Sequence, residues 1–189
     1  MASYTVLLDA CVMYPAPLRS YLMYLSQTGL YRARWTNDIH NEWIRNLLLN
    51  RPELDPARLE RTKQLMNDNA PDCLVEGYEP LIDGLELPDV DDRHVLAAAI
   101  KGQAEGIVTF NLKDFPEEIL SPLGISAIHP DIFLSDMIEL NPSAAIQAAQ
   151  NQRRSLKNPP MTNEEYLDCL MRQKLPTFVS RLSQFKAIL

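Results

Sequence analysis

The stretch Ile107-Val108-Thr109-Phe110-Asn111-Leu112-Lys113-Asp114-Phe115 is an apolar, β-branched run followed at once by polar side chains. Such a run predicts a strand over 107–109 that is buried on both faces, as in a parallel sheet. Asn111 and Asp114 come directly after it. These two residues could simply close a turn, or they could supply one amide and one carboxylate to a metal ion and its waters.

A second apolar run, Tyr4-Thr5-Val6-Leu7-Leu8, stops at Asp9 and predicts another buried strand over 4–8. A carboxylate at the end of such a strand is costly unless it is paired, hydrogen-bonded or bound to a metal. The alternative is that Asp9 caps the turn that follows the strand.

Helical patterns separate and follow these runs. Hydrophobic spacing and capping residues predict helices over 18–28, from Thr36 through Leu47, over 56–69, from Asp91 or Asp92 to about Glu105, and near 116–121. Gly106 is expected to stop the fourth of these helices, and 76–88 to form an acidic loop. Two further short strands are expected at 73–75 and 125–128.

Strands that alternate with helices predict an α/β protein, a three-layer α/β/α domain with a parallel sheet of four or five strands. Four more helices are expected over 130–138, 143–156, 163–174 and 176–186. We therefore predict a compact α/β domain over 1–138 and a helical C-terminal extension over 139–189. Ligands of such sheets bind beyond the carboxyl ends of the strands, where Asp9, Asn111 and Asp114 are expected.

The segment Leu87-Pro88-Asp89-Val90-Asp91-Asp92-Arg93-His94-Val95 crowds three acids at the start of a helix. Capping and a favourable interaction with the helix dipole would explain one of them. The others repel it and each other, and a cation would relieve that repulsion. Glu42 lies beside the apolar stripe formed by Ile39 and Trp43, although a glutamate in a helix is by itself most often a surface residue.

Taken together, Asp9, Glu42, Asp92 and Asp114 are four acids that the predicted topology brings to one edge of the sheet. Carboxylates and waters are the ligands that Mg²⁺ and Mn²⁺ prefer. Such ions polarise a phosphodiester, activate water and stabilise the leaving oxygen. The pattern therefore favours a metal-dependent nuclease.

The chain resembles PIN-domain proteins of the VapC-like toxin group. The resemblance rests on Leu7-Leu8-Asp9, the helical Glu42, Asp92 followed by Val95 and an alanine run, and Val108 to Phe115. By this resemblance Asp9, Glu42, Asp92 and Asp114 correspond to the family's acidic metal-binding residues, and Asn111 to a polar position near them. The spacing to Val95 and Ala97 favours Asp92 over Asp91 as the motif acid, which leaves Asp89 and Asp91 as accessory or capping residues.

The family implies a ribonuclease that depends on Mg²⁺ or Mn²⁺ and is usually neutralised by an antitoxin protein; a homodimer is a further possibility. The rival interpretation is a PIN-like module that only binds RNA or protein. A haloacid-dehalogenase-type phosphatase is excluded because Cys11 stands where its second aspartate is needed. No glycine-rich phosphate loop is present, and His40, His94 and His129 lack zinc-binding spacing.

The formal net charge of −7 is unevenly distributed. From residue 150 onward there are seven basic and three acidic residues, which gives +4, whereas residues 1–149 hold 11 basic and 22 acidic residues, which gives −11. The basic tail is expected either to contact RNA or an acidic partner, or simply to cover core surface.

Three widely spaced cysteines indicate neither a zinc site nor a disulfide framework. The sequence has no apolar run of transmembrane length and no signal-peptide pattern at its start, so a cytoplasmic location without membrane attachment is expected.

Overall fold

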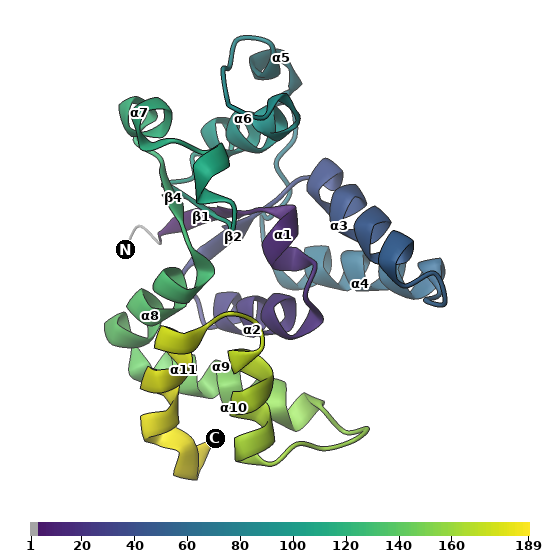
Figure 1. Cartoon of the computed structure of the whole chain (residues 1–189), viewed down its shortest axis with the longest axis vertical. Helices are drawn as coiled ribbons and strands as arrows, with labels where there is room; N and C mark the ends of the chain where they lie inside the picture. The colour runs from purple at the N-terminus through teal and green to yellow at the C-terminus, as the bar shows by residue number, and fades with distance from the viewer. Residues whose placement is uncertain (1–3) are drawn as a thin grey trace.

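The computed structural model describes residues 4–189 and has a four-stranded parallel sheet at its centre (Figure 1). The strand order is β2-β1-β3-β4, and all three neighbouring pairs are parallel. The strands are β1 (Thr5–Leu8), β2 (Arg32–Arg34), β3 (Gly106–Val108) and β4 (Ser126–Ile128).

Helices connect the strands and continue beyond them. They are α1 (Ala10–Met13), α2 (Ala16–Gln27), α3 (Asn37–Asn50), α4 (Pro56–Asn69), α5 (Glu79–Ile82), α6 (Arg93–Lys101), α7 (Glu117–Leu120), α8 (Pro130–Leu140), α9 (Pro142–Ser155), α10 (Asn163–Met171) and α11 (Pro176–Leu182). Short 3₁₀ turns are η1 (Val90–Asp92), η2 (Leu112–Asp114), η3 (Ser121–Leu123) and η4 (Ser183–Ile188).

The helices form layers on both sides of the sheet. Figure 1 shows α6 on one side, and α2 with the C-terminal helices α8 to α11 on the other. The helix α6 packs on β1 and β3, the two central strands. The predicted three-layer α/β/α fold with C-terminal helices is thereby confirmed.

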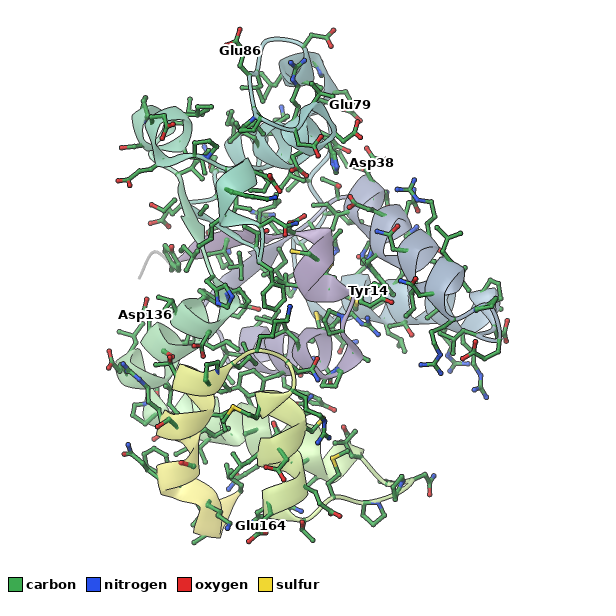
Figure 2. All side chains as sticks on the ribbon, in the orientation of Figure 1. Tyr14, Asp38, Glu79, Glu86, Asp136 and Glu164 are labelled. Atoms are coloured by element: carbon green, nitrogen blue, oxygen red, sulfur yellow. The ribbon has the colours of Figure 1, made fainter. Side chains whose placement is uncertain are left out.

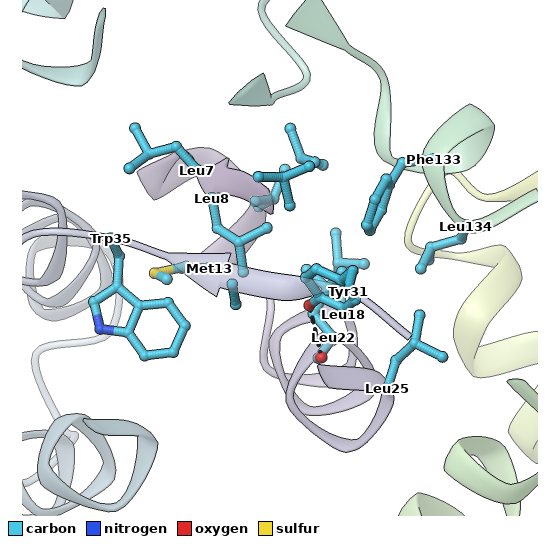
Figure 3. Packing of buried hydrophobic residues seen from close by; sticks show 14 of the residues in the cluster. Leu7, Leu8, Met13, Leu18, Leu22, Leu25, Tyr31, Trp35, Phe133 and Leu134 are labelled. Carbon is cyan, nitrogen blue, oxygen red and sulfur yellow. Dashed lines mark hydrogen bonds between the residues drawn. The ribbon is translucent and has the colours of Figure 1, made fainter. Parts of the chain in front are cut away.

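The central strand β1 is buried along its whole length, as its apolar sequence predicts. Figure 3 shows Leu7 and Leu8 of this strand within the core, together with Leu18 of α2. On the C-terminal side of the core, Tyr31 meets Phe133 of α8 edge to face, with ring centroids 5.1 Å apart.

The prediction of an independent strand over 73–75 was wrong. Leu74 forms only an isolated parallel bridge with Trp35, which extends the edge beside β2. The strand β2 itself was missed, because only Ala33 of its three residues is buried, whereas Arg32 and Arg34 give no apolar signal.

The helix expected to reach Glu105 ends at Lys101, with Gly102 as its C-cap. Gly106 does not stop that helix; it is the first residue of β3. A Cβ there would lie 2.9 Å from side-chain atoms of Ile128 and Tyr4, so close packing of β3 requires glycine. The short helices α1 and α5 were also missed, the second of them inside the segment expected to be a loop.

The C-terminal extension is joined to the sheet domain by buried polar contacts as well as by apolar packing. The Tyr21 hydroxyl of α2 donates to the Ala145 carbonyl of α9 at 3.1 Å. The fully buried Gln152 donates to the Pro17 carbonyl at 2.8 Å and accepts from the Tyr166 hydroxyl at 2.7 Å. Buried residues on both sides of position 138 belong to one hydrophobic cluster, and the boundary itself stays a prediction.

Three cations of the basic tail are engaged within the chain. Arg153 donates to the carbonyls of Met161 and Leu189, Arg181 pairs with Glu139, and Lys186 pairs with Glu164. Within residues 4–189, no helix combines the length and the apolar character needed to cross a bilayer.

Candidate active site

Asp9 lies at the carboxyl end of β1 and is only 4% exposed. Its Oδ1 accepts a 2.7 Å hydrogen bond from the Ala10 amide, so it caps α1. Its Oδ2 accepts from the Thr109 hydroxyl at 2.7 Å and from the Cys11 thiol at 3.1 Å. Asp9 therefore caps α1, as one sequence-based interpretation expects, and it is also hydrogen-bonded, as the other requires, by Cys11 of α1 and by Thr109, which directly follows β3.

Burial raises the pKa of Asp9, and the nearby charge of Glu42 adds to this shift. The three donated hydrogen bonds act in the opposite direction, because they stabilise the charged form. The net shift of the Asp9 pKa is upward, so the effect of desolvation outweighs that of the hydrogen bonds. A buried carboxylate of this kind gains from a nearby positive charge.

Asp92 ends η1 and precedes α6, but its side chain does not cap that helix. Burial raises the pKa of Asp92 to about 7, and repulsion by Asp9, Asp89, Asp114 and Glu42 contributes. The carboxyl group of Asp92 thus lies in the field of the other three predicted site acids. This cluster of Asp9, Glu42, Asp92 and Asp114 is called the acidic cluster below.

The other two acids of the Asp89-Val90-Asp91-Asp92 segment are placed differently. Asp89 accepts a 2.9 Å hydrogen bond from the Asp91 amide and caps η1. Asp91 is exposed, and its side chain has no hydrogen bond within residues 4–189. The geometry shows a capping position for Asp89, and the accessory role of Asp91 stays a prediction.

Glu42 projects from α3 and is half-buried. Its Oε2 lies 3.7 Å from Nε2 of His94, which is an ion-pair distance and too long for a good hydrogen bond. Burial lowers the pKa of His94, but Glu42, with Asp38 and Asp9, outweighs burial, and the net shift is upward. Nδ1 of His94 is buried and has no partner within the described chain.

Asp114 ends η2 and is half-buried, whereas Asn111 is exposed at the start of the same turn. The backbone N–H of Asn111 donates to Oγ1 of Thr109 at 3.0 Å. Thr109 therefore connects this turn with Asp9. The structure thus brings Asp9, Glu42, Asp92 and Asp114 into one electrostatic neighbourhood, with Asn111 beside Thr109.

The acidic cluster is an electrostatic neighbourhood, not a closed set of ligands. Within residues 4–189, no three His, Cys, Asp or Glu side chains lie close enough together to hold one ion. Over the same residues, none of the four acids is paired with lysine or arginine, and Glu42 lies at ion-pair distance from His94. Oxygen donors with uncompensated negative charge fit a hard divalent cation, which would have to draw the side chains together.

Sequence reasoning missed Thr109 and Cys11 at this site. Thr109 is fully buried, and Cys11 lies 3.3 Å from its hydroxyl while accepting a hydrogen bond from the Phe110 amide. Burial raises the pKa of the Cys11 thiol to about 12, so the thiol stays neutral. The available signal for Thr109 was a polar residue at the end of an apolar strand; Cys11 gave none beyond its closeness to Asp9.

Residues 5–113 match the PIN domain, which is more than half of the chain. The chain belongs to the PIN-domain family. Residues 130–184 match a second family, described as the VapC50 C-terminal domain, and these residues cover α8 to α11. The chain is therefore a VapC-like PIN protein with a C-terminal extension.

A curated relative is the Mycobacterium tuberculosis (strain ATCC 25618 / H37Rv) protein named "Putative ribonuclease VapC50". It is 41% identical to this PIN protein over 105 residues, which are 56% of this chain and 61% of the relative. The match thus spans less than two thirds of that relative's length. No solved structure matches this chain.

Proposed function

We propose that this PIN protein is an endoribonuclease that hydrolyses RNA phosphodiester bonds with the help of Mg²⁺ or Mn²⁺, and that it is the toxin of a type II toxin–antitoxin pair acting in the cytoplasm. The observation that carries the proposal is the acidic cluster at the carboxyl edge of the sheet. The name of the mycobacterial relative supports the choice of RNA as substrate.

Asp9, Glu42, Asp92 and Asp114 would hold the cation through their carboxylate oxygens. When bound, a divalent cation polarises the phosphodiester and lowers the pKa of a bound water. Thr109 fixes the direction of Oδ2 of Asp9, and the Ala10 amide fixes Oδ1. Burial and the neighbouring acids raise the pKa of Asp92 to about 7, so a proton would compete with a cation for this carboxylate, and cation affinity should rise with pH.

The decisive experiment is cleavage of a varied set of RNAs by the wild type and by Asp9→Asn, each with metal and with EDTA. We expect cleavage only by metal-loaded wild type. Asp136→Asn is the matched control, because Asp136 is an exposed acid on α8, away from the acidic cluster (Figure 2). Equal cleavage by all samples would point to a contaminating nuclease and refute the proposal.

The second candidate function is RNA or protein binding without catalysis. It is favoured by one observation, the lack of any three-member ligand group within residues 4–189. RNA binding without cleavage by the metal-loaded wild type would select it.

The antitoxin pairing needs a separate test in cells. Expression of the wild type should inhibit growth, and Asp9→Asn should not. Co-expression of a small reading frame immediately upstream, encoding a DNA-binding protein, should restore growth. Inhibition by Asp9→Asn as strong as that by the wild type would contradict a nuclease toxin.

A further inference from the structure

A cavity of about 460 Å³ opens beside the acidic cluster. Its lining residues come from α1 and the residue after it, from α3, and from the start of η2: Ala10, Cys11, Tyr14, Glu42, Asn46, Leu49, Asn50 and Asn111. Figure 2 shows Tyr14 between α1 and α3. The cavity thus shares Glu42, Cys11 and Asn111 with the surroundings of the acidic cluster, and its other residues extend away from that cluster.

The helix α3 forms one wall of this cavity. Glu42, Asn46 and Asn50 are spaced four residues apart, so they lie on one face of the helix, one above the other. The wall therefore changes along its length from a carboxylate at the acidic cluster to two neutral amides farther away. A substrate that reaches the cluster would also pass these amides.

The amide of Asn46 is placed to bind something outside the protein. Asn46 is half-buried, and within residues 4–189 its side chain has no hydrogen-bond partner. Asn50 is oriented by a 3.0 Å hydrogen bond from its Nδ2 to the Tyr14 hydroxyl. An amide that borders the cavity and has no protein partner is available to a ligand both as a donor, through Nδ2, and as an acceptor, through Oδ1.

The lining also excludes some ligands. None of the described residues around the cavity is a lysine or arginine, and its one charged residue is the acid Glu42. A phosphate or another anion would find no counter-charge here. A neutral, planar group with hydrogen-bonding edges suits the amides, and the Tyr14 ring and the exposed Leu49 offer surfaces for its faces.

We propose that this cavity receives one unpaired nucleobase of the RNA substrate, adjacent to the phosphodiester that is cut, and that Asn46 selects which base is accepted. The proposal rests on the proposed ribonuclease function, because that function places the scissile phosphate at the acidic cluster. Carboxamides recognise base edges by paired hydrogen bonds, and single-stranded segments are where proteins read RNA bases.

Binding tests the pocket without catalysis. The full-length Asp92→Asn protein lacks one of the four carboxylates proposed to hold the cation and should not cleave. Its affinity is measured by fluorescence anisotropy for labelled eight-nucleotide RNAs that differ at one position, which is A, C, G, U or abasic. We expect one base to bind about tenfold more tightly than the others, with the abasic RNA weakest.

In that background, Asn46→Ala should reduce the difference between bases to less than about threefold, whereas Tyr14→Ala should weaken all bases together. Asn41→Ala is the control, since Asn41 is an exposed amide on α3 that does not line the cavity. Thermal unfolding confirms that each variant is folded. A base preference that survives Asn46→Ala overturns the proposal.

Cleavage of a randomised single-stranded RNA by otherwise wild-type protein with Mn²⁺ separates the two proposals. Sequencing of the products should show one preferred base at a fixed distance from the cut, and Asn46→Ala should relax that preference while cleavage continues. Cleavage without any preference overturns the base pocket and leaves the ribonuclease intact. Base-selective binding that depends on Asn46, without cleavage by the wild type, supports the pocket and refutes the ribonuclease.

Discussion

The hydroxyl of Thr109 donates a 2.7 Å hydrogen bond to Oδ2 of Asp9 across 100 residues of sequence. It joins the carboxyl ends of β3 and β1, which are neighbours in the sheet. Because Ala10 holds the other oxygen, the Asp9 carboxylate has a fixed orientation before any ligand arrives. In the proposed reaction, such prior ordering would reduce the cost of organising the site.

Thr109→Val should lower RNA cleavage by about tenfold to a hundredfold, since a hydrogen bond to a charged group contributes roughly 1.5–3 kcal/mol. Thr109→Ser keeps the hydroxyl and should stay within about threefold of wild type. The measurement is kcat at saturating Mn²⁺, together with the Mn²⁺ concentration that gives half-maximal rate. Equal rates for the valine and serine variants would show that this bond does not position Asp9.

The raised pKa of Asp92 predicts how the metal-free protein responds to pH. Because its pKa is about 7 in the folded state and about 3.9 in an unfolded chain, the folded state binds more protons between these values. Stability contributed by this group is therefore present at low pH and lost as pH rises toward 7. The half-exposed position is screened by solvent, which limits the effect to about 1 kcal/mol.

In EDTA, Asp92→Asn should therefore raise the melting temperature above that of wild type by a few degrees at pH 8, and by less at pH 5. Mg²⁺ or Mn²⁺ should stabilise the wild type more than the variant, because binding to the folded state adds to stability. Scanning calorimetry with and without metal measures both effects. A variant less stable than wild type at pH 8 in EDTA would contradict the account of Asp92.

His40 predicts the opposite pH dependence. It is fully buried and connects Trp43, which donates to its Nδ1, with Asn67, which accepts from its Nε2. Burial lowers the pKa of His40 to about 4, so the folded protein resists protonation. Stability should decrease by up to about 3 kcal/mol as pH falls from about 6.5 to about 4.

Urea unfolding of the wild type and of His40→Gln between pH 4 and pH 7 checks this dependence. The glutamine variant should be less stable at pH 7 and should lose the part of the pH dependence that comes from the imidazole. His129→Asn removes another imidazole and should retain the wild-type slope. If the stability of the wild type and that of His40→Gln changed with pH in parallel, His40 would not be the cause of the pH dependence.

Gln152→Leu should destabilise the fold by about 2–4 kcal/mol, because it leaves the Pro17 carbonyl and the Tyr166 hydroxyl without their partner. The expected decrease in melting temperature is about 5–10 °C for a chain of this size. Gln147→Leu, an exposed substitution on the same helix α9, should change it little. Similar melting temperatures for the two variants would show that these contacts do not hold the extension in place.

The sequence predicted the two central strands because their residues are continuously apolar, and it predicted the fold class from their alternation with helices. It could not predict β2, since Arg32 and Arg34 resemble surface residues and their pairing depends on β1. The end of α6 and the start of β3 were misplaced for a related reason. Gly106 was expected to end a helix, whereas it begins β3, where the side chains of Ile128 and Tyr4 leave no room for a Cβ.

For the candidate site, the acids gave a sequence signal because carboxylates at strand ends and helix starts are unusual. The neutral residues that bind Asp9 gave no such signal. Cys11 and Thr109 are ordinary residues until the folded chain places them 3.3 Å apart beside Asp9. The contact between Glu42 and His94 likewise depends on how α3 and α6 lie in the folded chain, which no local pattern reports.

The edge strand β4 (Ser126–Ile128) lies between the two matched regions, since the PIN match ends at residue 113 and the C-terminal match begins at residue 130. Its three residues pair with Gly106 to Val108 and complete the sheet. A hybrid protein that exchanges the C-terminal helices between relatives should therefore be joined after Ile128. A junction at the end of the PIN match would graft a foreign strand onto β3 and replace Asp114 at the same time.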